Sequence, residues 1–307
     1  MNNVYLQIIA IAMIIAFLCF LIFYICSAFS KRALKRVNLN ILYEGKDLEG
    51  INFVDENCVN KYTYSEDDKK LKLNAKEIKQ KTFTHKWAVV IHGHKRDYKF
   101  VSKQGKSFFE EGYNILLPNL RGHGESEGNI ATLGILDCND IANWCNLILE
   151  EDKDAQIVLY GISMGAATVM NTAGLNLEFN KNIIAVIEDC GFTSPYKQVQ
   201  FILTRDYPFP KEMTMLLINL YTKIKYGLDL KSVKPIESIK NTNVPILFIH
   251  GNQDLYIPPF MAEELYESYK GPKEIIMVNG AEHATSIDVI EEEYFEKIFN
   301  FLEKFKN

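Results

Sequence analysis

Charged side chains are missing from the first 30 residues, which contain no Asp, Glu, Lys, Arg or His. Within that stretch residues 4–28 are almost wholly apolar, and a helix needs about 20 such residues to span a bilayer. A cleaved signal peptide has a basic start and a shorter apolar run of roughly 7 to 15 residues, whereas this chain begins Met1-Asn2-Asn3. The pattern therefore predicts an uncleaved transmembrane helix at residues 4–29, in preference to a buried helix of a soluble protein.

Positive charge begins directly after the apolar run, at Lys31, Arg32, Lys35 and Arg36. Basic residues that flank a membrane span tend to stay in the cytoplasm. We therefore expect a single-pass protein of the cell membrane, with the bilayer as the partner of its N-terminal helix and its main domain in the cytoplasm. A juxtamembrane segment at residues 30–55 would join this helix to a domain at residues 56–307.

A basic stripe is absent from the rest of the chain. Leaving out the four flanking residues, 30 basic residues remain against 39 acidic ones, a net charge of −9, so nucleic-acid binding is not expected. The six cysteines show neither the paired spacing of a metal site nor that of a redox pair, so no disulfide framework is indicated.

Short apolar runs recur between longer helical stretches from Trp87 onward. Such runs are typical of buried parallel strands, because both faces of a parallel sheet are covered. They lie at residues 88–91, 114–117, 157–160, 183–187, 245–249 and 274–278, and the stretches at 135–149 and 166–175 are long enough for crossover helices. The alternation predicts an α/β fold with a mostly parallel, doubly wound sheet, whose ligands bind beyond the carboxyl ends of the strands.

Two segments depart from this rhythm. Alternating residues at 62–64 and 71–75 predict a hairpin ahead of the parallel strands. Residues 192–243 are helical in character and rich in aromatics, which predicts a cap inserted between two strands. One face of a helix in this cap would carry Met213, Leu216, Leu217, Leu220 and Ile224, either to line a pocket or simply to seal the core.

The sequence Gly161-Ile162-Ser163-Met164-Gly165 lies between a predicted strand and a predicted helix. In that context Gly-x-Ser-x-Gly is typical of a tight turn that projects the serine hydroxyl toward substrate. The alternative is a plain turn with a capping serine. A serine hydroxyl becomes a strong nucleophile only when a neighbouring base takes its proton, and that base needs an orienting acid.

His283 and Asp254 are the predicted base and acid, since each follows a late strand and the order Ser, Asp, His is the one used by hydrolases with this turn. The alternatives are a turn residue that caps the next helix for Asp254 and a loop histidine bonded to the backbone for His283. Asp189, at the end of another predicted strand, is the alternative acid. Acyl transfer also needs backbone donors for an oxyanion, and the N–H groups of Met164 and His94 are the candidates.

Two other sequence features give only weak evidence of a binding site. His92 and His94 lack a third convergent ligand, so no metal site and no cofactor are predicted. The loop Arg121-Gly122-His123-Gly124-Glu125-Ser126 lacks the lysine and the spacing of a phosphate-binding loop, and we interpret it as a structural loop at the rim of the site.

Over residues 86–301 the chain resembles bacterial α/β-hydrolases of the serine aminopeptidase-like group, which include membrane-anchored members, and more distantly the eukaryotic hydrolase-domain proteins that remove palmitoyl groups. The resemblance rests on His92-Gly93 and on residues 119–124, 160–167, 188–194, 249–254 and 280–284. Relatives often carry an aromatic residue and a further glycine after the His-Gly turn, where this chain has His94 and Lys95. The resemblance implies the α/β-hydrolase fold and cofactor-independent hydrolysis.

These features predict a membrane-anchored serine hydrolase that cleaves a small acyl ester or thioester through an acyl-enzyme. A serine peptidase of the aminopeptidase-like group is the main alternative, although no acidic pocket for a substrate amine is evident. A non-catalytic membrane scaffold is the alternative from another class of protein.

Overall fold

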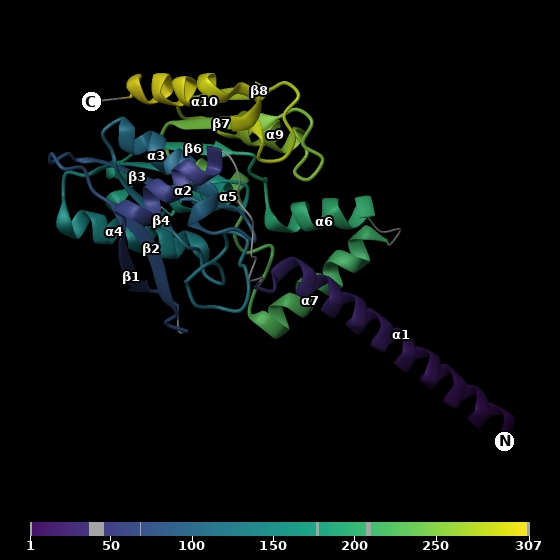
Figure 1. Ribbon diagram of the computed structural model, residues 1–307. Helices are drawn as coiled ribbons and strands as arrows, with labels where there is room; N and C mark the ends of the chain where they lie inside the picture. The colour runs from purple at the N-terminus through teal and green to yellow at the C-terminus, as the bar shows by residue number, and fades with distance from the viewer. Residues whose placement is uncertain (1, 37–45, 68, 176–177, 207–209, 306–307) are drawn as a thin grey trace.

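Eight strands form one sheet in the order β1-β2-β4-β3-β5-β6-β7-β8 (Figure 1). The computed structural model describes residues 2–36, 46–67, 69–175, 178–206 and 210–305. The strands are β1 (Val59–Tyr64), β2 (Lys72–Ile78), β3 (Lys86–Ile91), β4 (Asn114–Pro118), β5 (Gln156–Ile162), β6 (Ile183–Asp189), β7 (Ile246–Gly251) and β8 (Lys273–Val278). The predicted hairpin forms, since β1 and β2 pair antiparallel, and β2 pairs antiparallel with β4. All other pairs are parallel, which confirms the mostly parallel sheet.

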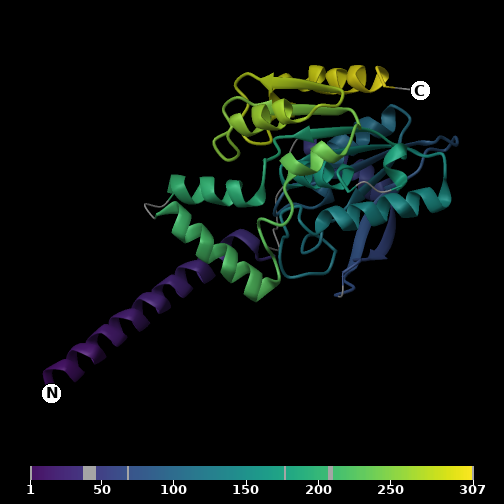
Figure 2. The ribbon, with the colours of Figure 1, turned by 180° about the vertical axis from the view of Figure 1, so that it is seen from behind.

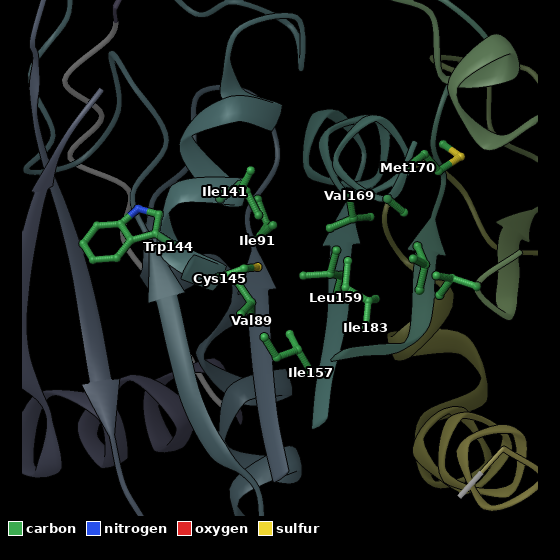
Figure 3. Packing of buried hydrophobic residues seen from close by; sticks show 14 of the residues in the cluster. Val89, Ile91, Ile141, Trp144, Cys145, Ile157, Leu159, Val169, Met170 and Ile183 are labelled. Carbon is green, nitrogen blue, oxygen red and sulfur yellow. The ribbon is translucent and has the colours of Figure 1, made fainter. Parts of the chain in front are cut away.

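Helices cover both faces of the sheet. One apolar cluster joins Val89, Ile91, Ile157 and Leu159 of the strands to the helices α4 (Asp137–Glu151) and α5 (Met164–Ala173) (Figure 3). The same cluster includes Leu265 of α9 (Phe260–Ser268). The residues between them along the same strands point the other way, toward α2 (Lys46–Asn57), α3 (Ser102–Glu110) and α10 (Ser286–Glu303). Because successive side chains of a strand point to opposite faces, a strand that is apolar at every position can fill both layers. A mostly parallel sheet with helices packed on both faces is the doubly wound α/β-hydrolase fold.

The helix α2 begins within the segment that we predicted to be juxtamembrane and ends two residues beyond it. A methyl group on Gly50 would lie 2.7 Å from the backbone nitrogen of Lys103, so the absence of a side chain lets α2 approach α3 closely. Val54 of α2 is fully buried in the same layer. Part of the predicted segment at 30–55 is thus packed on the sheet, and its residues 37–45 lie outside the described residues.

An insertion between β6 and β7 forms a helical cap at the carboxyl edge of the sheet. It contains α6 (Pro195–Asp206), α7 (Lys211–Tyr226), α8 (Pro235–Ser238) and the short 3-10 helix η3 (Ile239–Asn241). The buried face of α7 is formed by Met215, Ile218 and Thr222. Four of the five residues that we expected to share an inward face point outward instead, with exposed fractions above one half: Met213, Leu216, Leu220 and Ile224.

The N-terminal helix α1 (Asn2–Leu34) projects away from the sheet and approaches the cap with its C-terminal end (Figures 1 and 2). Cys26 and Leu34 are buried there against Met215 and Ile218 of α7. In the part of the chain that the structure describes, no helix has the length and apolar character needed to cross a membrane, so the transmembrane helix predicted at 4–29 gains no support from the structure.

The C-terminal end of α1 is bonded to the main domain. The backbone N–H of Ala131 donates to the carbonyl oxygen of Leu34 at 2.7 Å, and that of Arg36 donates to the carbonyl oxygen of Asn129 at 2.9 Å. The guanidinium of Arg36 also donates to the carbonyl oxygen of Ser126 at 2.8 Å. This part of α1 is therefore an integral part of the fold.

Candidate active site

Ser163 occupies a strained turn between β5 and α5. Its backbone has φ 57° and ψ −113°, a conformation that a residue with a side chain rarely adopts and that is typical of an exposed nucleophile. The flanking glycines explain how the turn closes. A methyl group on Gly161 would lie 2.3 Å from the carbonyl carbon of Gly165, and one on Gly165 would lie 2.3 Å from the carbonyl oxygen of Ile91. Strand β5, the turn and α5 therefore fit together only with glycine at both positions.

His283 lies between Ser163 and Asp254. Its Nε2 atom is 3.0 Å from Oγ of Ser163, and its Nδ1 atom is 2.7 Å from Oδ2 of Asp254. The other carboxylate oxygen of Asp254 accepts hydrogen bonds from the backbone N–H groups of Tyr256 and Ile257, both at 2.8 Å. The structure thus brings together three residues from the ends of β5, β7 and β8, in the order that a proton relay requires.

The surroundings of Asp254 favour its ionised form. Burial opposes ionisation, but hydrogen bonds from His250 and His283 hold the pKa of the carboxyl well below its usual range. A charged carboxylate beside Nδ1 fixes the imidazole tautomer that leaves Nε2 free to accept a proton from serine.

His250 is a neighbour of this site that the sequence analysis did not single out. It is fully buried at the end of β7, with Nε2 2.9 Å from the carbonyl oxygen of Ile257 and 3.5 Å from Oδ2 of Asp254. Burial alone would lower the pKa of His250, but the hydrogen bond with Asp254 outweighs it, and the pKa is raised. His250 thereby braces the loop that carries the acid. Its position four residues before Asp254 is the sequence feature that could have identified it as a neighbour of the acid.

Asp189, the alternative acid, has a different partner. The hydroxyl of Tyr294 on α10 donates to its Oδ2 atom at 2.6 Å, and the hydroxyls of Tyr294 and Tyr160 are also 2.6 Å apart. Burial raises the pKa of the Asp189 carboxyl to about 6. Its backbone has a further contact, because the carbonyl oxygen of Asp189 accepts a hydrogen bond from the N–H of Ser163 at 2.8 Å. This residue therefore supports the nucleophile turn and the β6–α10 packing.

The loop after β3 approaches the nucleophile. A methyl group on Gly93 would lie 3.3 Å from the carbonyl oxygen of Ile162 and 3.4 Å from Cβ of Ser163, so the backbone of this loop lies directly beside the serine. His94, the next residue, lines the same cavity as Ser163 and Met164. Both predicted oxyanion donors thus belong to segments that border the serine hydroxyl.

The histidines near this loop have structural contacts. His92 accepts a hydrogen bond at Nε2 from the N–H of Leu120 at 3.0 Å, and its Nδ1 atom lies 2.7 Å from the carbonyl oxygen of Gly93. His123 packs its ring at 5.2 Å from that of His92. Burial lowers the pKa of His92 and of His94 to about 3, so both imidazoles are neutral.

Among the described residues, one group has the donor atoms for a metal ion: Cys190, Asp254 and His283, whose ligand atoms lie within 4.8 Å of one another. The residues present do not fit a metal. Asp254 and His283 are bonded to each other, and burial raises the pKa of the Cys190 thiol well above its ordinary value, whereas a metal would need the thiolate.

A cavity of about 260 Å³ opens beside Ser163. Most of its wall is apolar, and a few charged side chains are placed among the lining residues. The wall comprises Phe29, Arg32, Ala33, His94, Lys95, Leu133, Ser163, Met164, Phe192, Pro195, Gln198, Val199, Ile202, Arg205, Asp206, Tyr256 and Ile257. A cavity of this kind, which reaches the serine, can hold an apolar acyl group.

Fold and site together have the arrangement found in α/β-hydrolases. Residues 84–233 match the family described as serine aminopeptidase, S33. The chain is 27% identical over 216 residues to the uncharacterized protein YqkD of Bacillus subtilis, with 70% of each chain covered. It is 26% identical to the uncharacterized membrane protein YNL320W of Saccharomyces cerevisiae, over 62% of this chain and 61% of that one.

The solved structures agree at the level of the fold. The esterase PF2001 of Pyrococcus furiosus superposes with a TM-score of 0.65 at 17% sequence identity, over 90% of this chain and 100% of that one. At such low identity the likeness concerns the fold alone. The expected α/β-hydrolase fold is therefore confirmed, and the chemistry of this chain depends on its own site.

Proposed function

We propose that the protein is a serine hydrolase that cleaves carboxylic esters or thioesters, with Ser163 as nucleophile, His283 as general base and Asp254 as the acid that orients it. One observation carries the proposal: Nε2 of His283 lies 3.0 Å from the serine oxygen, while Nδ1 lies 2.7 Å from a carboxylate whose ionised form is favoured. The esterase-like solved structures support the same class of reaction.

The reaction proceeds in two halves. Oγ of Ser163 attacks the carbonyl carbon of the substrate while its proton passes to Nε2 of His283. The resulting oxyanion accepts hydrogen bonds from the backbone N–H groups of Met164 and His94, each worth about 3 kcal/mol in the transition state. Collapse breaks the bond to the alcohol or thiol, which leaves with the proton held by His283. Water then attacks the acyl-enzyme, with the same imidazole as base, and releases the acid and the free serine.

An amine-recognising peptidase fits the cavity less well. The family name would favour it, but recognition of a substrate amine requires an available carboxylate. Asp206 is the one carboxylate among the described residues that line the cavity, and its Oδ1 atom already lies 2.7 Å from Nε of Arg205. The apolar wall instead favours an uncharged acyl group.

Membrane attachment through α1 belongs to the same proposal. The apolar side chains of α1 that are described outside its packed end are more than half exposed, as at Ile8, Phe17 and Phe20, and Lys31 follows on the exposed side. Exposed apolar surface of this extent marks a protein or membrane contact. We propose a membrane location with the main domain in the cytoplasm. Full-length protein recovered in the supernatant of carbonate-washed membranes would contradict it.

A fluorophosphonate probe tests the chemistry directly. Wild type is expected to be labelled on Ser163 and to hydrolyse p-nitrophenyl esters, whereas Ser163→Ala is expected to lose both properties. Ser232→Ala removes an exposed serine and serves as the control. Folded wild type that neither reacts with the probe nor hydrolyses any ester or thioester would refute the proposal and favour a non-catalytic scaffold. Cleavage of aminoacyl amides alone would favour the peptidase.

A further inference from the structure

The cavity beside Ser163 is partly formed by the N-terminal helix. Phe29, Arg32 and Ala33 of α1 lie in the wall that also contains the nucleophile, although they are more than a hundred residues away from it in sequence. The spacing of these three residues is i, i+3 and i+4, so they share one face of α1. A single helical face is thus turned toward the site.

Helix α6 forms an adjoining part of this wall. Pro195, Gln198, Val199, Ile202 and Arg205 also recur every three or four residues and lie on one face. Ten residues of helix separate the first from the last, which corresponds to about 15 Å along the axis. The wall that α6 gives to the cavity is therefore extended, and its middle part is aliphatic.

The wall from α1 is held in place by the loop that carries the candidate oxyanion donor. Nζ of Lys95, which directly follows His94, donates to the carbonyl oxygen of Arg32 at 2.8 Å. Leu34 and Cys26, on either side of the lining residues, are buried under α7. The last turns of α1 are therefore fixed relative to Ser163 on two sides.

We propose that α1 is a specificity element of the enzyme, and that Phe29 and Ala33 form the wall against which an extended acyl chain lies, together with Val199 and Ile202 of α6. The inference rests on the proposed function and adds the substrate class, which is esters or thioesters of medium to long unbranched acyl chains. Apolar side chains on two helices fit methylene groups without any polar partner. The small side chain of Ala33 leaves room that a larger one would fill.

Ala33→Phe tests this wall, and Ala28→Phe is its matched control because Ala28 lies on the same helix with its side chain exposed. Both variants and wild type are compared on p-nitrophenyl acetate, butanoate, octanoate and dodecanoate. Ala33→Phe is expected to lower kcat/KM for dodecanoate about tenfold or more while leaving acetate within about twofold, since a filled apolar pocket rejects the groups it formerly held. Ala28→Phe is expected to match wild type on every ester.

A binding measurement separates this inference from the proposed chemistry. The same two substitutions are placed in Ser163→Ala protein, and the Kd of a fluorescent dodecanoate analogue is measured. Weaker binding with Ala33→Phe alone supports the wall even if wild type hydrolyses no ester, in which case only the proposed function fails. An equal loss of activity on all chain lengths, or an unchanged Kd and unchanged chain-length profile, would overturn the inference.

Discussion

The hydroxyl of Tyr294 donates a hydrogen bond to Oδ2 of Asp189 at 2.6 Å. This contact gives the second candidate acid a partner on α10, while His283 lies 2.7 Å from Asp254. Two carboxylates that end neighbouring strands thereby have different tasks: Asp254 faces the imidazole, and Asp189 joins the sheet to a helix behind it.

Exchange of each acid for its amide tests this division. Asp254→Asn is expected to lower kcat about 10⁴-fold, because the amide no longer fixes the productive tautomer of His283. Asp189→Asn keeps an acceptor for Tyr294 and is expected to retain activity within about tenfold of wild type. Ester hydrolysis by both variants, after their folding is verified by thermal melts, provides the measurement. The reverse ranking would transfer the acid role to Asp189.

Glu188 makes stability depend on pH. Burial raises the pKa of its carboxyl to about 8 in the folded protein, whereas an unfolded chain releases this proton near pH 4.3. Between these values the folded state binds more protons than the unfolded state, so the free energy of unfolding falls as pH rises. Glu188→Gln removes this dependence, and its urea midpoint is expected to exceed that of wild type by more at pH 8 than at pH 5. The exposed Glu111→Gln should show no such difference, and a parallel pH response of the Glu188 variant would contradict the argument.

Gly93 sets the distance between the loop after β3 and the nucleophile. A methyl group at this position would press on the carbonyl oxygen of Ile162 at 3.3 Å and on Cβ of Ser163 at 3.4 Å. Gly93→Ala is therefore expected to lower kcat by about tenfold to a hundredfold, because small displacements of reacting groups are costly. The thermal midpoint should change little. Full activity in this variant would show that the loop yields without disturbing the serine.

Arg121 anchors the glycine-rich loop by a buried ion pair. Its Nε and NH2 atoms each lie 2.7 Å from an oxygen of Asp140, and NH1 lies 2.6 Å from Oδ2 of Asp67. Arg121→Met leaves Asp140 buried without its countercharge and is expected to destabilise the fold by about 3–5 kcal/mol. Activity of the folded fraction at low temperature should persist, since the loop is structural. Adding Asp140→Leu is expected to restore much of the lost stability, and failure to do so would assign the loss to another contact.

The strand predictions succeeded because they rest on local sequence, and so does the tight turn that was predicted at Ser163. An apolar run such as that at 157–160 is buried on both faces wherever a doubly wound sheet forms, and the glycines around Ser163 are demanded by its own turn. The choice between Asp254 and Asp189 was different. Both residues follow a strand, and only the path of the β7–α9 loop and the position of Tyr294 distinguish them.

The contribution of α1 to the cavity wall could not be predicted from its sequence. An apolar helix without charges has the same pattern whether lipid or protein covers it, and here Phe29 and Ala33 near its end line a cavity. The prediction for α7 was wrong in the opposite sense. Leu216 and Leu220 were expected to face inward, but both side chains are exposed. Periodicity defines a face, but tertiary packing decides what that face meets.

The placement of α1 has a practical consequence for recombinant work. A shortened form that begins after residue 36 would keep the whole sheet and the triad residues, but it would lack Phe29 and Ala33 from the cavity wall. It would also expose Met215 and Ile218 of α7, which α1 covers in the intact chain. Such a fragment would lack one wall of the cavity and would carry added exposed apolar surface, which promotes aggregation. Substrate profiles or inhibitor screens performed on it would describe a different enzyme from the intact chain.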